Sequence, residues 1–253
     1  MKQELTDYRP PEDLLNGRVI LVTGAAQGIG RAAALAFAAH GATVVLHDIK
    51  VAPLEKLYDE IEAAGGPQPA IFPLDLVTAG ESEYDGMASA IYKQLARLDG
   101  ILHNAAYLSH LSPLENETLD QWTKTLRANL IAPFALTKAC LPLLKVSPDA
   151  SVVMTSDHHG NRPSAYWGCF AIAKGGVEHL VKMWAQELEI VPQIRINAVI
   201  PGPVQSPQRR RTHPGELYEA LPPVERLIPT YLYLMGGDSR GMSGSVVNLG
   251  AVG

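Results

Sequence analysis

The sequence is poor in cysteine. Only two occur among 253 residues, Cys140 and Cys169, and they lie far apart in the chain. This scarcity excludes a disulfide-rich secreted domain and a C-x-x-C metal or redox motif, and it favours a reducing, cytoplasmic compartment. No uninterrupted apolar run reaches the roughly 18 residues of a membrane span, and the N-terminus lacks the apolar core of a signal peptide.

Positive charge is also in deficit. Lysine and arginine number 21 against 26 aspartates and glutamates, for a formal net charge of −5. This balance excludes bulk attraction to nucleic acid or to an anionic membrane. With 47% hydrophobic and 19% charged residues, the chain suits a single globular domain over residues 1–253. Residues 1–17 are polar, contain Pro10-Pro11 and form an expected N-terminal extension.

Short apolar runs alternate with longer helical patterns along the chain. This alternation predicts an α/β fold, a Rossmann-type, doubly wound, seven-stranded parallel sheet flanked by helices. Ligands of such folds bind at the carboxyl ends of the strands. The expected strands cover residues 18–22, 43–46, 70–74, 101–103, 151–154, 194–199 and 245–248.

The first strand leads into a glycine-rich turn, Thr23 to Gly30, and then into an alanine-rich helix. Gly24 permits a tight turn, Gly28 lets the backbone approach a phosphate, and Gly30 lets the helix lie close to the strand. The free N–H groups at a helix start favour an anion. The turn therefore predicts a binding site for the pyrophosphate of a dinucleotide.

The second strand ends at Asp48, about 20 residues after the glycine turn, at the place of the acidic residue that binds the ribose of NAD. Its carboxylate can accept both ribose hydroxyls of NAD and would repel the 2′-phosphate of NADP. Neither Ile49 nor Gln27 in the turn supplies a positive charge. The sequence therefore favours NAD over NADP.

Several motifs stand in order from Arg18 to Asn248: the glycine turn, Asp75, Asn104-Ala-Ala, Asn129, Lys174 and Pro201-Gly202. In them the chain resembles the short-chain dehydrogenase/reductase family, and Trp167–Lys174 with Tyr231–Met235 resembles its YciK-like oxidoreductases. The resemblance implies oxidation of an alcohol or reduction of a carbonyl. The implied cofactor contacts are Gly24, Gln27, Gly28, Ile29, Gly30, Asp48, Asp75, Leu76, Asn104, Ala105, Lys174, Pro201, Gly202, Val204 and Ser206.

The same resemblance implies a catalytic Tyr-x-x-x-Lys pair, a serine about 13 residues before the tyrosine, and an asparagine. Lys174 and Asn129 match, but Phe170 stands at the tyrosine position and Asp157 at the serine position. A phenylalanine ring has no proton to donate. The candidate substitutes are Asp157 and, one turn before Phe170, Tyr166. We interpret His158-His159 as a solvent-facing or pocket loop, and we expect no metal site.

Two hypotheses follow for the function. In the first, the protein is an NAD(H)-dependent oxidoreductase whose protons are carried by Asp157, Lys174 and Tyr166 or a histidine. In the second, it is a catalytically silent relative that binds NAD(H) or another ligand as a sensor, scaffold or partner subunit. The family resemblance also implies a homodimer or homotetramer built through the long helices expected at 119–144 and 168–190.

Overall fold

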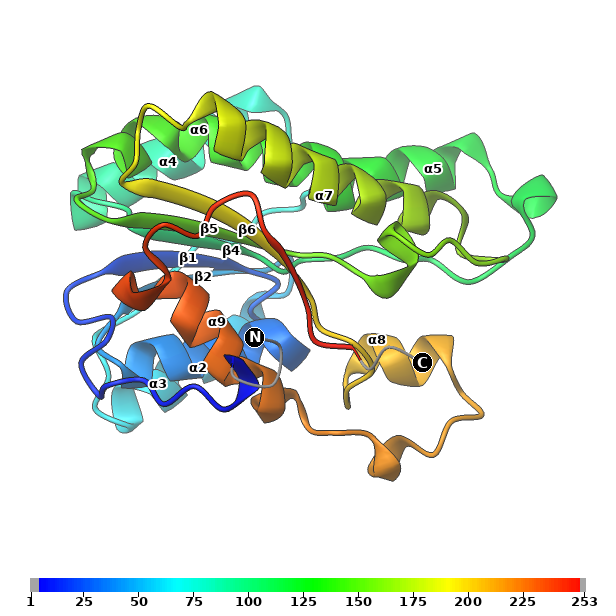
Figure 1. The fold of residues 1–253 in the computed structure, drawn as a ribbon, viewed down its shortest axis with the longest axis horizontal. Helices are drawn as coiled ribbons and strands as arrows, with labels where there is room; N and C mark the ends of the chain where they lie inside the picture. The colour runs from blue at the N-terminus through cyan, green and yellow to red at the C-terminus, as the bar shows by residue number, and fades with distance from the viewer. Residues whose placement is uncertain (1–4, 251–253) are drawn as a thin grey trace.

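The computed structural model describes residues 5–250. Its centre is a sheet of seven parallel strands in the order β3-β2-β1-β4-β5-β6-β7, with helices on both faces (Figure 1). The predicted Rossmann-type fold class is confirmed. The strands are β1 Val19–Thr23, β2 Thr43–His47, β3 Ala70–Ile71, β4 Gly100–His103, β5 Ala150–Thr155, β6 Ile194–Ile200 and β7 Val246–Asn248.

The helices form one layer on each side of the sheet, α2, α3 and α9 below it and α4 to α7 above it in Figure 1. Their apolar faces and the strands give two cores, one against each face. Strand order reverses between β1 and β4, and this switch point opens a crevice for ligands. The helices are α2 Gly28–Ala39, α3 Val51–Ala63, α4 Glu81–Leu95, α5 Leu119–Leu126, α6 Ala132–Val146, α7 Gly168–Glu187, α8 Pro207–Thr212 and α9 Ile228–Met235.

Local sequence explains why β1 and the start of α5 form where they do. All five residues of β1 are apolar or threonine and all are buried, as the central strand of a parallel sheet requires. Thr118 caps α5 by accepting a hydrogen bond from the Gln121 N–H, and Gln121 in turn accepts one from the Thr118 N–H, which satisfies free helix-start donors.

The predicted long helix over 119–144 is three segments. A π-helical turn, Arg127–Ile131, joins α5 to α6 and contains Asn129. Pro133 therefore lies at the start of α6, directly after the π-turn, and has no N–H to donate to the preceding turn. The stretch Leu119–Val146 meets the length and composition test for a membrane span, with mean hydropathy 1.3. It packs against α4 and α7, and a core helix of a soluble protein passes the same test.

Two segments lie outside the sheet. Residues 5–17 of the expected extension pack on their own chain, since Tyr8 contacts the Tyr233 ring edge-on at 5.2 Å and its hydroxyl donates to Asp238 at 2.7 Å. Residues 1–4 lie outside the described part. The Arg- and Pro-rich segment after β6 contains a helix, α8, which lies beside the carboxyl ends of the strands (Figure 1).

Candidate active site

A pocket of about 850 Å³ lies at the carboxyl edge of the sheet, around the switch point between β1 and β4. Its walls come from the glycine turn, the loops after β2 to β6, helix α7 and helix α8. Most of the predicted cofactor contacts line it. Those that do are Gly24, Gln27, Gly28, Ile29, Asp48, Asp75, Leu76, Asn104, Ala105, Lys174, Pro201, Gly202, Val204 and Ser206.

Close backbone packing shapes the glycine turn. Gly24 has a φ of +70°, and a Cβ there would lie 2.8 Å from the Cα of Ala105. A Cβ on Gly30 would collide with the Gly24 carbonyl oxygen and lie 2.7 Å from the Asn104 side-chain nitrogen. Gly30 is buried and lies outside the pocket lining. These two glycines allow the turn to pack closely against α2 and the loop after β4, and a turn of this kind suits a dinucleotide pyrophosphate.

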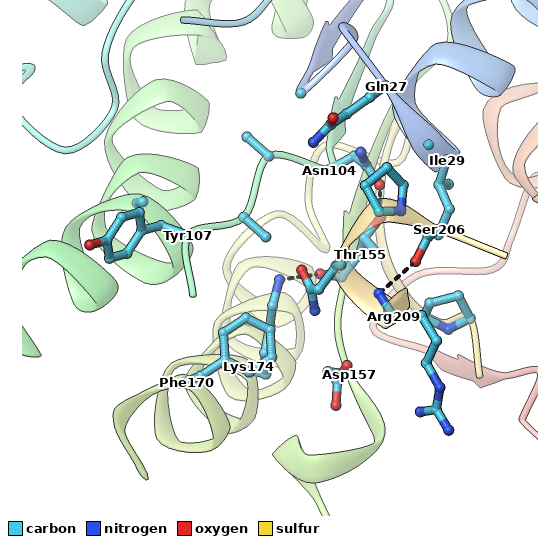
Figure 2. Close-up of a pocket in the computed structure, with 18 of the residues that line it drawn as sticks. Gln27, Ile29, Asn104, Tyr107, Thr155, Asp157, Phe170, Lys174, Ser206 and Arg209 are labelled. Atoms are coloured by element: carbon cyan, nitrogen blue, oxygen red, sulfur yellow. Dashed lines mark hydrogen bonds between the residues drawn. The ribbon is translucent and has the colours of Figure 1, made fainter. Parts of the chain in front are cut away.

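The loop after β4 is tied to the glycine turn. The Thr23 hydroxyl oxygen accepts hydrogen bonds from the N–H groups of Asn104 at 3.0 Å and Ala105 at 3.1 Å. The Thr155 hydroxyl donates to the Asn104 side-chain oxygen at 3.3 Å (Figure 2). These bonds join the ends of three neighbouring strands, so the side of the pocket where the sequence predicts the cofactor is preformed.

Asn129 lies beside the pocket rather than in its wall. Its buried side-chain nitrogen donates to the carbonyl oxygens of Tyr107 at 2.7 Å and Thr125 at 2.9 Å. Its oxygen accepts from the Tyr107 N–H at 3.3 Å. The side chain therefore braces the loop after β4, and the π-turn aims it there.

Lys174 points into the pocket from α7, beside Phe170 on the same face (Figure 2). Its ammonium donates to the Thr155 carbonyl oxygen at 2.8 Å and lies 5.5 Å from the centre of the Phe170 ring. Burial lowers the pKa of Lys174 to about 8, and the charge of Asp157 opposes this shift. The lysine is therefore a buried cation, 4% exposed, poised to lose its proton near neutral pH.

Asp157 is paired with a histidine two residues later. One carboxylate oxygen accepts from the His159 N–H at 2.9 Å and lies 2.7 Å from the ring nitrogen Nδ1 of His159. Burial alone would raise the pKa of Asp157, but the hydrogen bonds from His159 and the nearby Lys174 charge hold that pKa below its ordinary value. Asp157 is therefore ionised at neutral pH, and it caps the short 3₁₀ turn His158–Gly160.

An aromatic wall holds the histidine ring. His159 stacks on Trp167 with ring centres 3.6 Å apart and planes 14° apart. Trp167 in turn contacts Phe170, with ring centres 5.9 Å apart, and it lies 6.0 Å from the His213 ring. The position that the family resemblance assigns to tyrosine is thus filled by Phe170, 2% exposed, within an apolar cluster.

Tyr166 and Cys169 flank this wall and have other surroundings. Tyr166 is 57% exposed, with a φ of +74°, and it lies outside the pocket lining. The structure therefore does not bring it to Lys174. Burial and the nearby Glu117 raise the pKa of the Cys169 thiol to about 11, so this sulfur stays protonated and is a poor nucleophile.

Helix α8 covers the pocket, and its three arginines all have partners. Arg209 forms two hydrogen bonds with Glu216 at 2.6 and 2.7 Å. Arg210 lies over the Tyr218 ring at 4.2 Å, and Arg211 donates to the Leu108 carbonyl oxygen at 2.7 Å. The Ser206 hydroxyl oxygen, predicted to meet the cofactor, accepts from the Arg209 N–H at 3.2 Å and caps α8 (Figure 2).

Residues 18–216 match the sequence profile of the short chain dehydrogenase family. The chain belongs to the short-chain dehydrogenase family. The oxidoreductase YciK of Escherichia coli K12 is 38% identical over 237 residues, 94% of this chain and 93% of YciK. This relative confirms the likeness to the YciK-like members of the family.

Two solved structures of relatives contain a cofactor. The structure from Shigella flexneri 2a, complexed with NADP, has a TM-score of 0.91 and 37% identity, and covers 94% of this chain and 99% of its own. The structure from Escherichia coli CFT073, complexed with NADPH, has a TM-score of 0.91 and 37% identity, and covers 95% and 99%. The predicted preference for NAD is therefore wrong, because these short-chain dehydrogenases point to NADP.

The surroundings of Asp48 explain why its charge is a poor guide to the cofactor. Its carboxylate already accepts from the N–H groups of Ala26 at 3.3 Å and Lys50 at 3.1 Å. It is thus partly engaged in shaping the glycine turn. Lys50 also lines the pocket, one residue beyond Ile49, and a lysine is a suitable partner for a phosphate.

Sequence reasoning also missed Trp167 and His213 as pocket residues. Trp167 entered the sequence analysis only as part of the stretch Trp167–Lys174. His213 follows an arginine- and proline-rich run that gave no sign of α8, the helix at whose end His213 reaches the pocket. The spacing of Asp157 and His159 could have predicted their pairing, since an aspartate side chain commonly accepts a hydrogen bond from the backbone N–H two residues later.

Proposed function

We propose that this protein is an NADP(H)-dependent oxidoreductase that interconverts an alcohol and a carbonyl compound, with a non-standard acid/base site. The observation that carries the proposal is the preformed cofactor cradle, closed by the buried cation of Lys174 next to the Thr155 carbonyl oxygen. The two relatives complexed with NADP and NADPH support the choice of cofactor.

The residues present fit that cofactor. The glycine turn and the N-terminal N–H groups of α2 would hold the pyrophosphate, Lys50 the 2′-phosphate, and Lys174 the nicotinamide ribose. Once bound, NADPH supplies the hydride for reduction. Asp157 and Lys174 then provide the charges on the substrate side, where Phe170 cannot exchange a proton. Reduction needs a proton at the substrate oxygen, so one of the polar pocket residues must deliver it.

Titration with NADPH, followed by nicotinamide fluorescence, tests the first half of this proposal. Tight binding of NADPH is expected, and Lys50→Ala should weaken binding of NADPH more than binding of NADH. A panel of alcohols and carbonyl compounds then tests turnover, and Asp157→Ala should abolish it. Full turnover by this variant would contradict the assigned role of Asp157.

Phe170 favours a second candidate function, a catalytically silent NADP(H)-binding protein that acts as a sensor, scaffold or partner subunit. This candidate predicts no hydride transfer across the panel. It also predicts measurable carbonyl reduction by the double variant Asp157→Ser, Phe170→Tyr, which restores both family residues. Ready turnover by the unmodified protein would refute it.

We further infer that the protein acts as a homodimer or homotetramer in the cytoplasm. The outer faces of α6 and α7 expose Phe134 and Met183, 43% and 56% accessible, beside a shallow apolar groove of about 270 Å³. A second copy would cover these side chains. Sedimentation equilibrium tests this inference, and a monomer at micromolar concentration would contradict it.

A further inference from the structure

With Phe170 at the tyrosine position, no residue has yet been assigned to exchange the proton of the reaction. The paired side chains of Asp157 and His159 lie in the same pocket. We propose that His159 is the proton donor and acceptor of the reaction and that Asp157 positions it. The proposal rests on the proposed oxidoreductase function. The juxtaposition that carries it is a carboxylate 2.7 Å from one imidazole nitrogen, with the ring stacked on Trp167 in the pocket wall.

The carboxylate fixes the tautomer of the imidazole. An ionised carboxylate has no proton to donate, so His159 Nδ1 must carry the proton of the 2.7 Å hydrogen bond. The second ring nitrogen, Nε2, is then the one that exchanges protons. No side chain or backbone group within the described residues 5–250 makes a hydrogen bond to Nε2, and the residue lines the pocket. Nε2 is thus available to a substrate oxygen.

Two contacts hold the ring in place. Stacking on Trp167 fixes the ring plane, and the bond to Asp157 fixes its rotation within that plane. The backbone contributes as well, because the His159 N–H donates to the same carboxylate at 2.9 Å. A base held in one orientation by a third group is the arrangement that general acid–base catalysis requires.

The proton balance is complete in both directions. In reduction, the carbonyl carbon gains the hydride and the carbonyl oxygen gains the proton of His159 Nε2–H. The C=O double bond becomes a C–O single bond, and the imidazolium becomes neutral imidazole, which solvent reprotonates. In oxidation, neutral Nε2 accepts the hydroxyl proton while the carbon loses a hydride. Asp157 stabilises the imidazolium throughout and keeps its own charge.

The test compares His159→Gln, Asp157→Asn and the matched control His158→Gln. The amide oxygen introduced by Asp157→Asn can still accept the His159 N–H, so the turn is retained while the charge is lost. We expect kcat to fall about 100-fold or more in His159→Gln, about 10-fold in Asp157→Asn, and less than about 3-fold in His158→Gln. The Kd for NADPH, from fluorescence, should change less than about 2-fold in all three because the cofactor contacts remain.

A readout independent of turnover is the ¹⁵N spectrum of His159. In the unmodified protein, we expect the neutral His159 ring to carry its proton on Nδ1 and none on Nε2. In Asp157→Asn we expect a mixture of the two tautomers. If the unmodified protein is active and His159→Gln has the same kcat, the proposed roles of His159 and Asp157 are wrong, but the proposed oxidoreductase function stands. Absence of turnover by the unmodified protein would overturn the dyad together with the proposed function, and protonation on Nε2 would overturn the role of Asp157.

Discussion

The two halves of the pocket are built from different material. On the cofactor side the shape comes from backbone, from glycines without room for a Cβ and from the Thr23 hydroxyl that ties two loops together. On the substrate side it comes from side chains, among them Phe170, Trp167 and the pair of Asp157 with His159. A binding site made by backbone changes only with the fold, whereas a site made by side chains can exchange its chemistry one residue at a time.

The largest expected effect is on the backbone-built half. Replacing Gly30 by alanine places a Cβ against the Gly24 carbonyl and the Asn104 side chain. Because the Gly24 backbone cannot retreat without opening the turn, we expect NADPH affinity to fall about 100-fold, the equivalent of overpacking by about 3 kcal/mol. Fluorescence titration measures the Kd.

Gly86 provides the control for this substitution. It lies inside α4, and a Cβ there meets nothing within 4 Å. Alanine at this position should leave the Kd for NADPH unchanged and raise the free energy of unfolding by about 1 kcal/mol, since glycine weakens a helix interior. Equal cofactor affinity in both variants would show that the turn is adaptable and that the proposed contrast between the halves fails.

The next effect concerns Lys174, where the two halves meet. Burial lowers its pKa from 10.5 to about 8, so the folded protein loses this charge as pH rises through about 8. The affinity for the anionic cofactor should therefore fall between about pH 7 and about pH 9. Lys174→Met should bind NADPH about 10-fold more weakly near pH 7, because a charge-assisted contact is lost, and its Kd should no longer depend on pH in this window.

The free energy of unfolding should rise with pH, whereas the affinity for the cofactor falls. Between about pH 8 and pH 10.5 the unfolded lysine keeps its proton while the folded one has lost it. The unfolded state then binds more protons, so the free energy of unfolding rises with pH through this group. Urea titrations of the unmodified protein and Lys174→Met across this range test the sign, and identical slopes for both proteins would contradict the lowered pKa.

The sequence predicted the fold and the glycine turn that lines the pocket because both depend on short-range rules. The apolar run of β1 and the glycines after it fix a strand, a turn and a helix start within a few residues. Cofactor preference was wrong because it depends on which way the Asp48 carboxylate turns and on what lies beside it, namely the Ala26 and Lys50 N–H groups.

The substrate side was harder to predict because its contacts need the loop conformation. The sequence identified His158-His159 only as a solvent-facing or pocket loop and gave neither ring a partner. In the structure, β5 ends at Thr155, and a 3₁₀ turn returns His159 to Asp157. Similarly, a uniform helix over 119–144 gave no reason for Asn129 to reach Tyr107, which the π-turn at Arg127–Ile131 explains.

A smaller effect is expected from restoring tyrosine alone. Phe170→Tyr adds a hydroxyl to a ring that is 2% exposed, within 5.5 Å of the Lys174 ammonium. If His159 carries the proton, turnover should change less than about 3-fold, and the free energy of unfolding should fall by about 1 kcal/mol for burying a polar group. A rise in turnover of about 10-fold or more would instead place the proton chemistry at position 170.

The smallest effect is expected where α8 is fastened to the rest of the pocket. Arg211 alone of the three arginines bonds to the loop after β4, through the Leu108 carbonyl oxygen, whereas Arg210 contacts Tyr218 within the cover itself. Arg211→Ala should raise the KM for the substrate about 3-fold with kcat unchanged, because one partly exposed hydrogen bond contributes about 1 kcal/mol or less.

Arg210→Ala is the matched control for this comparison, since it removes the same charge from the same helix. It should leave KM unchanged, because α8 stays fastened through Arg211. Steady-state kinetics of the two variants therefore separate the fastening of α8 from the loss of positive charge. An equal rise in KM in both variants would show that charge near the pocket mouth, and not the bond to Leu108, governs substrate capture on the side-chain-built half.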